Sequence, residues 1–386
     1  MILLEAPYVS EFLIDTITRN HYTVIPDDFV LTHYKELTDP LITAADCIHR
    51  LLEGSEFLYT NSENAFAWVS KNLGPTSYPD LIDIFKDKAR FRELIAGLYP
   101  EVFFKKVSWA ELNALDKETF SYPLVLKPTV GFFSLGVNIV KNPSDWDIAI
   151  SSLKKDITRI KNLYPEQVIN VSDFIIESYI EGEEFAFDCY FNKAGEPVVL
   201  TVMKHLFSSD SDVGDRLYMT SVDIIVQIKD KVDAFLKQLG NLIPMSNFPL
   251  HIEVRLWKGK LIPIEVNPMR FGGWCTTADV TWYAYGFNSY EYFFNQRQPD
   301  WENILKREDR ATYSIVILDI PATHRKKTIK GFDYEKLLTR FENPLELRKI
   351  DFRQHPVFGF LFLKTSPGNS KELEAILQDD LTDFIV

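Results

Sequence analysis

The sequence predicts a protein of the α/β class whose central part is an α+β core. Residues 1–85 alternate short apolar runs with helical spacing, which is typical of βαβ units around a parallel sheet. Residues 122–270 are rich in strand signals, with helical segments between them. Residues 311–386 again mix strand and helix signals. We therefore expect three structural units along the chain.

The composition is that of a folded acidic protein. The chain has 386 residues, of which 46% are hydrophobic and 25% are charged, and this length suffices for two to four structural units. Its 55 acidic and 42 basic side chains give a net charge of −13. Because nucleic-acid phosphates favour basic surfaces, this balance argues against nucleic acid as a partner. It does not exclude a local cluster of lysines that binds an anionic small molecule.

The cysteines and the apolar runs indicate the cellular compartment in which we expect the protein. The three cysteines, Cys47, Cys189 and Cys275, are far apart, which predicts neither a disulfide framework nor a zinc pair. The first residues lack the basic region of a signal peptide. No apolar run approaches the roughly 20 residues that a membrane span needs. We therefore expect a cytoplasmic protein with no membrane contact.

The N-terminal unit lacks the sequence signature of a dinucleotide site. The apolar run at residues 1–6 is followed by helical spacing, and the next strand signal ends in turn residues. No G-x-G-x-x-G follows the first strand, which argues against a dinucleotide bound in the usual Rossmann manner. Glu63 begins a predicted helix after "FLYT". It is either a stabilising N-terminal acid or a contact for an amine.

The stretch "PLVLKPTVGFFSLGV" places a lysine before a glycine-bounded loop. Val125 and Lys127 share one face of the predicted strand. Gly131 and Gly136 permit close approach of backbone amides to phosphate oxygens, and Ser134 adds a hydroxyl donor. The pattern fits a purine stacked near bound phosphates. The alternative is an ordinary hairpin with a solvated lysine.

Two further segments carry acidic side chains on pairs of predicted strands that are joined by a short connection. In "IIESYIEGEEFAFDCYF", a short link around Gly182 joins two predicted strands, and its backbone can meet an adenine edge while Glu184 accepts ribose hydroxyls. Acidic strand–loop–strand segments are, however, common. In "HIEVRLWKGKLIPIEVNP", Glu265 and Asn267 share a face of the second strand.

The position of Glu253 depends on the hairpin turn. A three-residue turn, 258–260, puts Glu253 opposite Glu265, whereas a two-residue turn puts Ile264 there unless a bulge restores the parity. Two carboxylates and an amide oxygen at one place repel one another unless a cation is bound, and Mg²⁺ takes such oxygen ligands. The alternative is a pair of exposed strand acids.

Together and in this order, the three segments resemble the ATP-grasp superfamily of carboxylate–amine ligases. The resemblance covers roughly residues 85–300. It implies an N-terminal Rossmann-like pre-ATP-grasp domain at 1–85, a two-subdomain ATP-grasp fold at 86–310 and a small C-terminal α/β capping subdomain at 311–386. Within the ATP-grasp fold, it implies a nucleotide lid at about 104–181 and a metal-binding subdomain at 182–310.

The resemblance also implies roles for individual residues. Lys127 and Lys88 match the two lysines that contact the nucleotide phosphates. The residues expected to bind ATP are Lys88, Val125, Lys127, Gly131, Ser134, Gly136, Glu177, Ser178, Tyr179, Ile180 and Glu184, with Glu183 as a rival for the ribose. The expected metal ligands are Glu253, Glu265 and Asn267. The expected catalytic residues are Lys204, by its position after a strand, and Arg270.

One position departs from the family pattern. The family's arginine usually lies two residues after the asparagine, where this sequence has Met269; Arg270 follows one position later. Arg270 is therefore either a ligand for a substrate carboxylate or acyl-phosphate, or a partner in a surface ion pair.

The implied reaction uses ATP and Mg²⁺, with Mn²⁺ as an alternative ion. A carboxylate is activated as an acyl-phosphate, ADP is released, and an amine (or thiol) displaces the phosphate. The expected partners are a small carboxylic acid and an amine, for instance two amino acids, and 14% aromatic residues are compatible with a homodimer. The alternatives are a carboxylase or kinase on the same core, and an inactive ATP-binding subunit. The sequence does not identify the substrates, whose specificity we assign to the N-terminal unit, residues 208–220 and the residues after Arg270.

Overall fold

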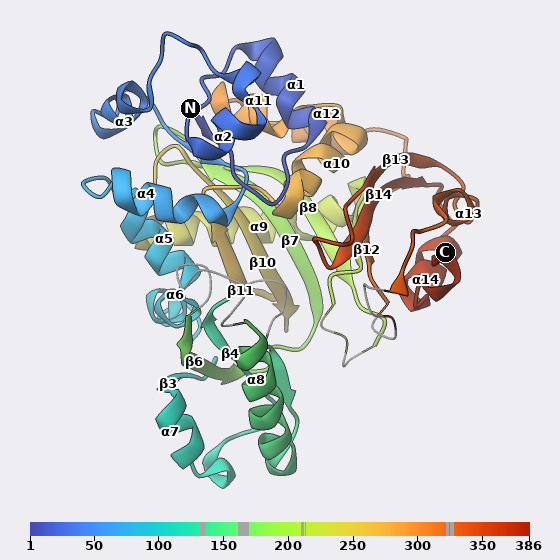
Figure 1. Ribbon diagram of the computed structural model, residues 1–386. Helices are drawn as coiled ribbons and strands as arrows, with labels where there is room; N and C mark the ends of the chain where they lie inside the picture. The colour runs from blue at the N-terminus through green and yellow to red at the C-terminus, as the bar shows by residue number, and fades with distance from the viewer. Residues whose placement is uncertain (132–135, 161–169, 210–211, 213, 322–323, 325–327) are drawn as a thin grey trace.

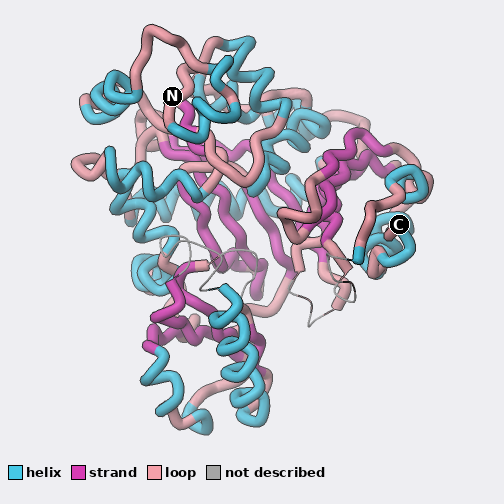
Figure 2. The backbone as a smooth tube through the Cα atoms, viewed as in Figure 1, coloured by secondary structure: helices cyan, strands magenta, loops and turns pink. Residues whose placement is uncertain are grey.

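The computed structural model describes residues 1–131, 136–160, 170–209, 212, 214–321, 324 and 328–386. Its centre is an eight-stranded sheet, with the N-terminal helices packed at one end and a small four-stranded lid at the other (Figure 1). The C-terminal strands lie along one edge of the large sheet. Helices and strands are both abundant (Figure 2), which confirms the α/β class.

The N-terminal unit is a short parallel pair surrounded by helices. Strand β1 (Ile2–Leu3) pairs in parallel with β2 (Tyr59–Thr60), and one further parallel bridge joins Ile2 to Val24. The parallel sheet is therefore smaller than the βαβ pattern suggests. Its helices are α1 (Glu11–Asn20), α2 (Asp28–His33), α3 (Ala44–Leu52) and α4 (Phe66–Asn72). The backbone N–H of Thr60 donates to the carbonyl of Met269 at 2.9 Å, so this unit is joined directly to the end of the large sheet.

Residues 78–95 form two helices. Helix α5 (Tyr78–Lys86) ends where Asp87 adopts an extended conformation, and α6 (Lys88–Ile95) begins directly after it. The Asp87 carboxylate accepts hydrogen bonds from the N–H groups of Ala89 and Arg90 at 2.8 and 3.2 Å. This cap satisfies the first free donors of α6, and such caps contribute about 1 kcal/mol. The break brings both Lys86 and Lys88 to the same region.

The lid is an antiparallel sheet with its own core. Strands β3 (Phe104–Ser108), β4 (Leu124–Val130), β5 (Asn138–Val140) and β6 (Asn170–Ser178) lie in the order β3-β6-β4-β5. Helices α7 (Trp109–Ala114) and α8 (Trp146–Ile160) cover one face (Figure 1). Leu124, Leu126 and Phe174 belong to a buried cluster that is separate from the main core. The lid thus packs as a unit.

The large sheet has the order β11-β10-β7-β8-β9-β12-β14-β13. Its strands are β7 (Glu183–Phe191), β8 (Pro197–Leu206), β9 (Leu217–Thr220), β10 (Phe248–Trp257), β11 (Lys260–Pro268), β12 (Thr312–Asp319), β13 (Pro344–Lys349) and β14 (Val357–Thr365). Helix α9 (Val222–Leu242) packs on it through apolar side chains three or four residues apart, including Ile225, Ile228 and Val232. Helices α10 (Thr276–Tyr285), α11 (Ser289–Phe294) and α12 (Trp301–Leu305) follow β11.

The β10–β11 hairpin turns through two residues, not three. Trp257 pairs with Lys260, and both Lys258 and Gly259 have positive φ, as in the tight turns that favour hairpins. A β-bulge between Glu253 and Val254 adds Ile264 to the opposite strand and restores the parity. Glu253 consequently pairs with Glu265.

The C-terminal strands extend the large sheet instead of forming a sheet of their own. Strand β12 pairs with β9 and with β14, and β13 closes the edge. Helices α13 (Tyr334–Leu338) and α14 (Lys371–Gln378) pack on them around a separate core that includes Leu361 and Phe384. Cys47, Cys189 and Cys275 are buried free thiols. None of the helices in the described part of the chain combines the length and apolarity required to cross a membrane.

Candidate functional site

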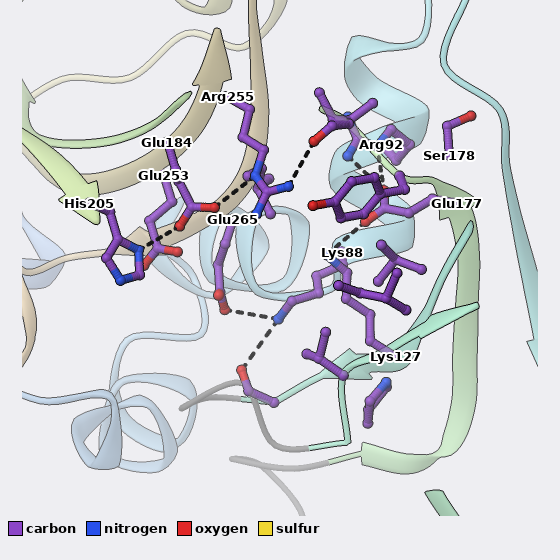
Figure 3. Close-up of a pocket in the computed structure, with 18 of the residues that line it drawn as sticks. Lys88, Arg92, Lys127, Glu177, Ser178, Glu184, His205, Glu253, Arg255 and Glu265 are labelled. Carbon is purple, nitrogen blue, oxygen red and sulfur yellow. Dashed lines mark hydrogen bonds and ion pairs between the residues drawn. The ribbon is translucent and has the colours of Figure 1, made fainter. Parts of the chain in front are cut away.

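The candidate site is a cavity between the lid and the β10–β11 hairpin (Figure 3). It encloses about 900 Å³ when its open mouth is included, which is within the usual range for small-molecule sites. The predicted site residues that line it are Lys88, Val125, Lys127, Gly131, Glu177, Ser178, Tyr179, Ile180, Glu184, Glu253 and Glu265. Residues more than 170 positions apart in the sequence thus meet at one place.

The lid wall of the cavity contains a buried ion triad. The ammonium group of Lys127 on β4 lies 2.7 Å from Oε1 of Glu177 on β6. The guanidinium of Arg92 on α6 donates to Oε2 of the same carboxylate from Nε at 3.0 Å and from Nη2 at 2.7 Å. All three side chains are about 5% exposed. Burial alone would raise the pKa of Glu177, but Arg92 and Lys127 outweigh it and lower this pKa to about 2.

Lys88 connects the lid to the hairpin. Its ammonium group lies 2.8 Å from Oε1 of Glu265 and 3.4 Å from the carbonyl oxygen of Gly131, at the start of the glycine loop. Burial would lower the pKa of Lys88, but Glu265 reverses the effect and raises it. The first residue of α6 therefore stays charged and points into the cavity.

The hairpin wall is acidic. The carboxyls of Glu253 and Glu265 occupy directly opposite positions on β10 and β11. Burial, followed by repulsion from Glu265, Glu184 and Asp215, raises the pKa of Glu253 well above its usual value. Lys88 pairs with only one of these acids, so the wall has more acidic groups than cations.

A divalent cation fits this set of oxygen donors. Mg²⁺ is commonly held by one or two carboxylates, with waters and substrate phosphates completing its coordination. Within the described ranges, no three His, Cys, Asp or Glu side chains form a complete metal site. Glu253 and Glu265 would therefore need further ligands, for instance phosphate oxygens. Asn267 is buried, two residues beyond Glu265, and pairs with His251 in the hairpin register, but it does not line the cavity.

At the other end of the cavity, Glu184 is held by two basic side chains. Nδ1 of His205 lies 2.8 Å from Oε1, and Nε of Arg255 donates to Oε2 at 2.9 Å. Burial would raise the pKa of Glu184, but His205 and Arg255 lower it overall. The Arg255 guanidinium also lies over the rings of Tyr179 and Phe207, at 5.1 and 5.7 Å. This end is a flat, partly aromatic surface with a fixed carboxylate.

The link between the lid and the large sheet is clamped to β10. Nη1 of Arg255 donates to the carbonyl of Ile180 at 2.8 Å. Gly182 has a φ of +118°, and a Cβ atom added there would lie 2.2 Å from the carbonyl oxygen of Leu256. Only glycine fits this approach, because a side chain would collide with backbone. The link and the strand that carries Glu253 are thus in direct contact.

A second ion triad lies beside the cavity. Glu63, after β2, pairs with Arg270 at 2.7 Å and with Lys86 in a shorter contact, and Lys86 also donates to the carbonyl of Gly131 at 3.2 Å. Burial would raise the pKa of Glu63, but Lys86 and Arg270 lower it to about 2. Arg270 and Glu63 are predominantly buried, so Arg270 is not in a surface ion pair. Both carboxylate oxygens of Glu63 already have cationic partners, which gives no support for a free amine contact.

Some predicted residues lie elsewhere. Lys204 and His205 are neighbours on β8 and therefore face opposite sides of the sheet. His205 lines the cavity, whereas Lys204 pairs with Glu183, so the structure does not bring Lys204 to the site. Gly136 has a positive φ, as the sequence suggests, but does not line the cavity. Ser134 lies outside the described residues.

The sequence analysis missed several cavity residues, namely Arg92, Pro128, Val137, Ile139, His205, Phe207, Asp215, Arg255 and Ile264. Two of them had a local signal. Arg92 is four residues after Lys88 and so shares its helix face. Arg255 is two residues after Glu253 and shares its strand face. Asp215 lies within residues 208–220, which the sequence analysis assigned to substrate specificity, and Phe207 directly precedes them.

Comparisons with known proteins agree with the resemblance inferred from the sequence. A family model for the ATP-grasp domain matches residues 120–278. The D-alanine–D-alanine ligase of Pediococcus pentosaceus is 24% identical over 223 residues, which cover 54% of this chain and 56% of that enzyme. The chain thus matches little more than half the length of this curated relative.

Solved structures extend the likeness over the whole fold. The L-amino acid ligase from Bacillus licheniformis has a TM-score of 0.66 at 18% identity, with 100% of this chain and 97% of that chain covered. The biotin carboxylase domain of the Hydrogenobacter thermophilus 2-oxoglutarate carboxylase, in complex with MgADP, ADP and bicarbonate, has a TM-score of 0.60 at 13% identity, covering 95% of this chain and 86% of that chain. The resemblance inferred from the sequence is confirmed.

Proposed function

Because residues 120–278 belong to the ATP-grasp family, we propose that this protein is an ADP-forming ligase that joins a carboxylic acid to an amine. The observation that carries this proposal is the meeting of Lys88 and Lys127 with Glu253 and Glu265 around one cavity. Basic side chains on the lid wall suit nucleotide phosphates, and acids on the hairpin wall suit a divalent cation.

The nucleotide would lie between the lid and the hairpin. Val125 and Ile139 on the lid and Ile264 on the hairpin supply apolar surface for a purine. The backbone of residues 178–180 would meet the adenine edge, and Glu184 would accept ribose hydroxyls with the lone pairs that His205 and Arg255 leave free. Lys127 and Lys88 would contact the phosphates. Hydrogen bonds between such charged groups are strongest in a site that excludes water.

The metal would be held by Glu253 and Glu265, with Asn267 as the further expected ligand. When bound, Mg²⁺ would neutralise phosphate charge and orient the terminal phosphoryl group. Its charge would also offset the repulsion that, together with the larger effect of burial, raises the pKa of Glu253.

The chemistry then needs positioning and charge neutralisation from the protein. The substrate carboxylate attacks the γ-phosphorus, the bond to the β,γ-bridging oxygen breaks, and ADP leaves with that electron pair. The amine then attacks the acyl carbon and expels inorganic phosphate, and the nitrogen loses a proton. Lys88 and Lys127 offset the negative charge that develops on the phosphates. No side-chain nucleophile takes part in either step.

Arg270 is the residue that we assign to the acid or acyl-phosphate. It lies two residues beyond the end of β11, the strand that carries Glu265, and is held by Glu63 and by the carbonyl of Phe271 at 2.9 Å. The names of two similar proteins, a D-alanine–D-alanine ligase and an L-amino acid ligase, make amino acids the first substrates to test.

The test is ADP release from Mg·ATP, measured with amino acids supplied singly and in pairs, with products identified by mass spectrometry. We expect ADP formation that depends on an acid and an amine, and a product with the mass of their condensation. Lys127→Ala and Glu265→Gln should each lower kcat/KM at least about 100-fold, the range for loss of a preorganised charge. Lys260→Ala is the matched control, since Lys260 is an exposed residue of β11 that pairs with Glu101.

Other outcomes separate the alternatives. Turnover that depends on bicarbonate or an alcohol would identify a carboxylase or kinase. ATP binding without turnover on the whole panel would favour the inactive subunit. Normal rates in Lys127→Ala or Glu265→Gln would refute the proposed site.

A further inference from the structure

The carboxylate of Glu177 is bound by more cationic charge than it can neutralise. One oxygen accepts from Lys127 and the other accepts twice from Arg92. Nη1 of Arg92 is buried and has no hydrogen-bond partner among the described residues, so Glu177 is the one carboxylate shown to bind this guanidinium. The buried triad therefore has one positive charge in excess, on the lid wall of the cavity.

Two other cations in the cavity each have a carboxylate partner. Lys88 pairs with Glu265 at 2.8 Å and Arg255 with Glu184 at 2.9 Å. The triad thus adds one positive charge beyond its carboxylate on the lid wall, and the acids near Glu253 lie on the opposite, hairpin wall. This division of charge complements a phosphate tail with its cation, because the anion meets the lid and the cation meets the acids.

We propose that Arg92 is a positioning residue for nucleotide binding. Its guanidinium compensates the negative charge of Glu177, so that the positive charge of Lys127 remains available to attract the nucleotide phosphates. This inference rests on the proposed function, since it concerns the same nucleotide site. Without Arg92, Glu177 and Lys127 form a neutral ion pair, and the ammonium group loses most of its attraction for an anion. Arg92 would thus act on the phosphate tail without touching the nucleotide.

The test compares ligands that differ in phosphate charge. Dissociation constants for ATP, ADP and adenosine are measured by equilibrium dialysis for the full-length protein, and the readout is the ratio of the adenosine constant to the ATP constant. In Arg92→Met we expect this ratio to fall at least about tenfold, because one charge is lost near the phosphates. Arg92→Lys keeps the charge and should restore most of the ratio.

The matched control is Arg90→Met on the same helix. Arg90 is more than half exposed and pairs with Asp83 at 3.4 Å, so its loss should leave the ratio within about twofold of the wild-type value.

The double variant Arg92→Met/Glu177→Gln separates charge from structure. It removes one positive and one negative charge together and leaves Lys127 unpaired, so the net charge of the wild-type triad is restored. We expect the ratio to return toward the wild-type value, even if both ligands bind more weakly because the Glu177 carboxylate is lost from the cavity wall. A structural role for Arg92 predicts no such recovery.

Three results would overturn the inference. One is an equal loss of ATP and adenosine affinity in Arg92→Met, another is an unchanged ratio, and the third is a double variant with a ratio as low as that of Arg92→Met. Wild-type protein that binds neither ATP nor ADP would instead refute the proposed function. Circular dichroism and thermal unfolding confirm that each variant is folded. If Arg92→Met is not folded, the comparison of Arg92→Lys with the wild type still tests the inference.

Discussion

Glu253 and Glu265 face each other across the β10–β11 hairpin, because a bulge offsets the two-residue turn at Lys258 and Gly259. Without the bulge, Ile264 would stand opposite Glu253 and the two acids would lie on different faces. The hairpin therefore places two like charges together inside a cavity, and this arrangement is unfavourable until a cation binds.

The first prediction concerns the energetic cost of these acids. Glu253→Gln removes a carboxyl whose pKa is raised by burial and by its acidic neighbours. At pH 7 and without metal, we expect the variant to be more stable than the wild type, because the neutral amide removes the cost of burying an acid beside acidic neighbours. Mg·ATP turnover should nevertheless be lost. Urea denaturation with EDTA and an ADP-release assay measure the two effects; a less stable variant would contradict the argument.

The second prediction concerns the lid connection. Gly182→Ala forces a Cβ atom against the carbonyl of Leu256 at a φ of +118°. We expect a loss of about 2–4 kcal/mol in the free energy of unfolding, together with weaker ATP binding, because the link must move away from β10. Gly54→Ala is the control: Gly54 also has a positive φ, of +70°, but nothing lies within 4 Å of an added Cβ. Its cost should be about 1–2 kcal/mol, with ATP binding unchanged. Equal effects on ATP binding would argue against the clamp.

The third prediction concerns acid stability. The pKa of Glu63 falls from 4.5 to about 2 in the folded protein. A lowered folded pKa gives stability that is fully present above about pH 4.5 and is lost as the pH falls toward 2. The shift corresponds to about 3 kcal/mol. Glu63→Gln should be less stable than the wild type at pH 7 and should lose less stability over this window. Urea denaturation between pH 7 and pH 2 tests this, and parallel curves would refute it.

The fourth prediction compares two neighbours on β8. His205 faces the cavity and binds Glu184, whereas Lys204 faces α9 and shares its partner Glu183 with Gln227, which donates to Glu183 at 3.1 Å. We expect His205→Ala to raise the dissociation constant for ATP about tenfold, because Glu184 loses a charge-assisted contact. Lys204→Ala should change it less than about twofold. The reverse order would restore Lys204 to the site.

The sequence was informative where chemistry depends on alternation within one strand. Val125 and Lys127, and likewise Glu265 and Asn267, share a face because side chains alternate along any strand. The sequence was less informative about the turns between strands and about where helices end. The segment at 78–95 has no glycine or proline where α5 ends, yet Asp87 separates the two helices and caps α6. Of the two hairpin turns that the sequence allows, the structure has the two-residue turn, with a bulge that restores the parity.

The sequence by itself predicted the resemblance to the ATP-grasp superfamily and most of the residues that line the cavity, because local periodicity and the order of three segments suffice for both. Tertiary structure decided which charges meet. Arg92 and Glu177 are 85 positions apart, and Glu63 and Arg270 are separated by 207, so no local pattern could pair them. It also decided that Lys204 faces away from the cavity and that the C-terminal strands extend the large sheet. The reason is physical: alternation follows from backbone geometry, whereas ion pairs and sheet edges depend on how helices and sheets pack.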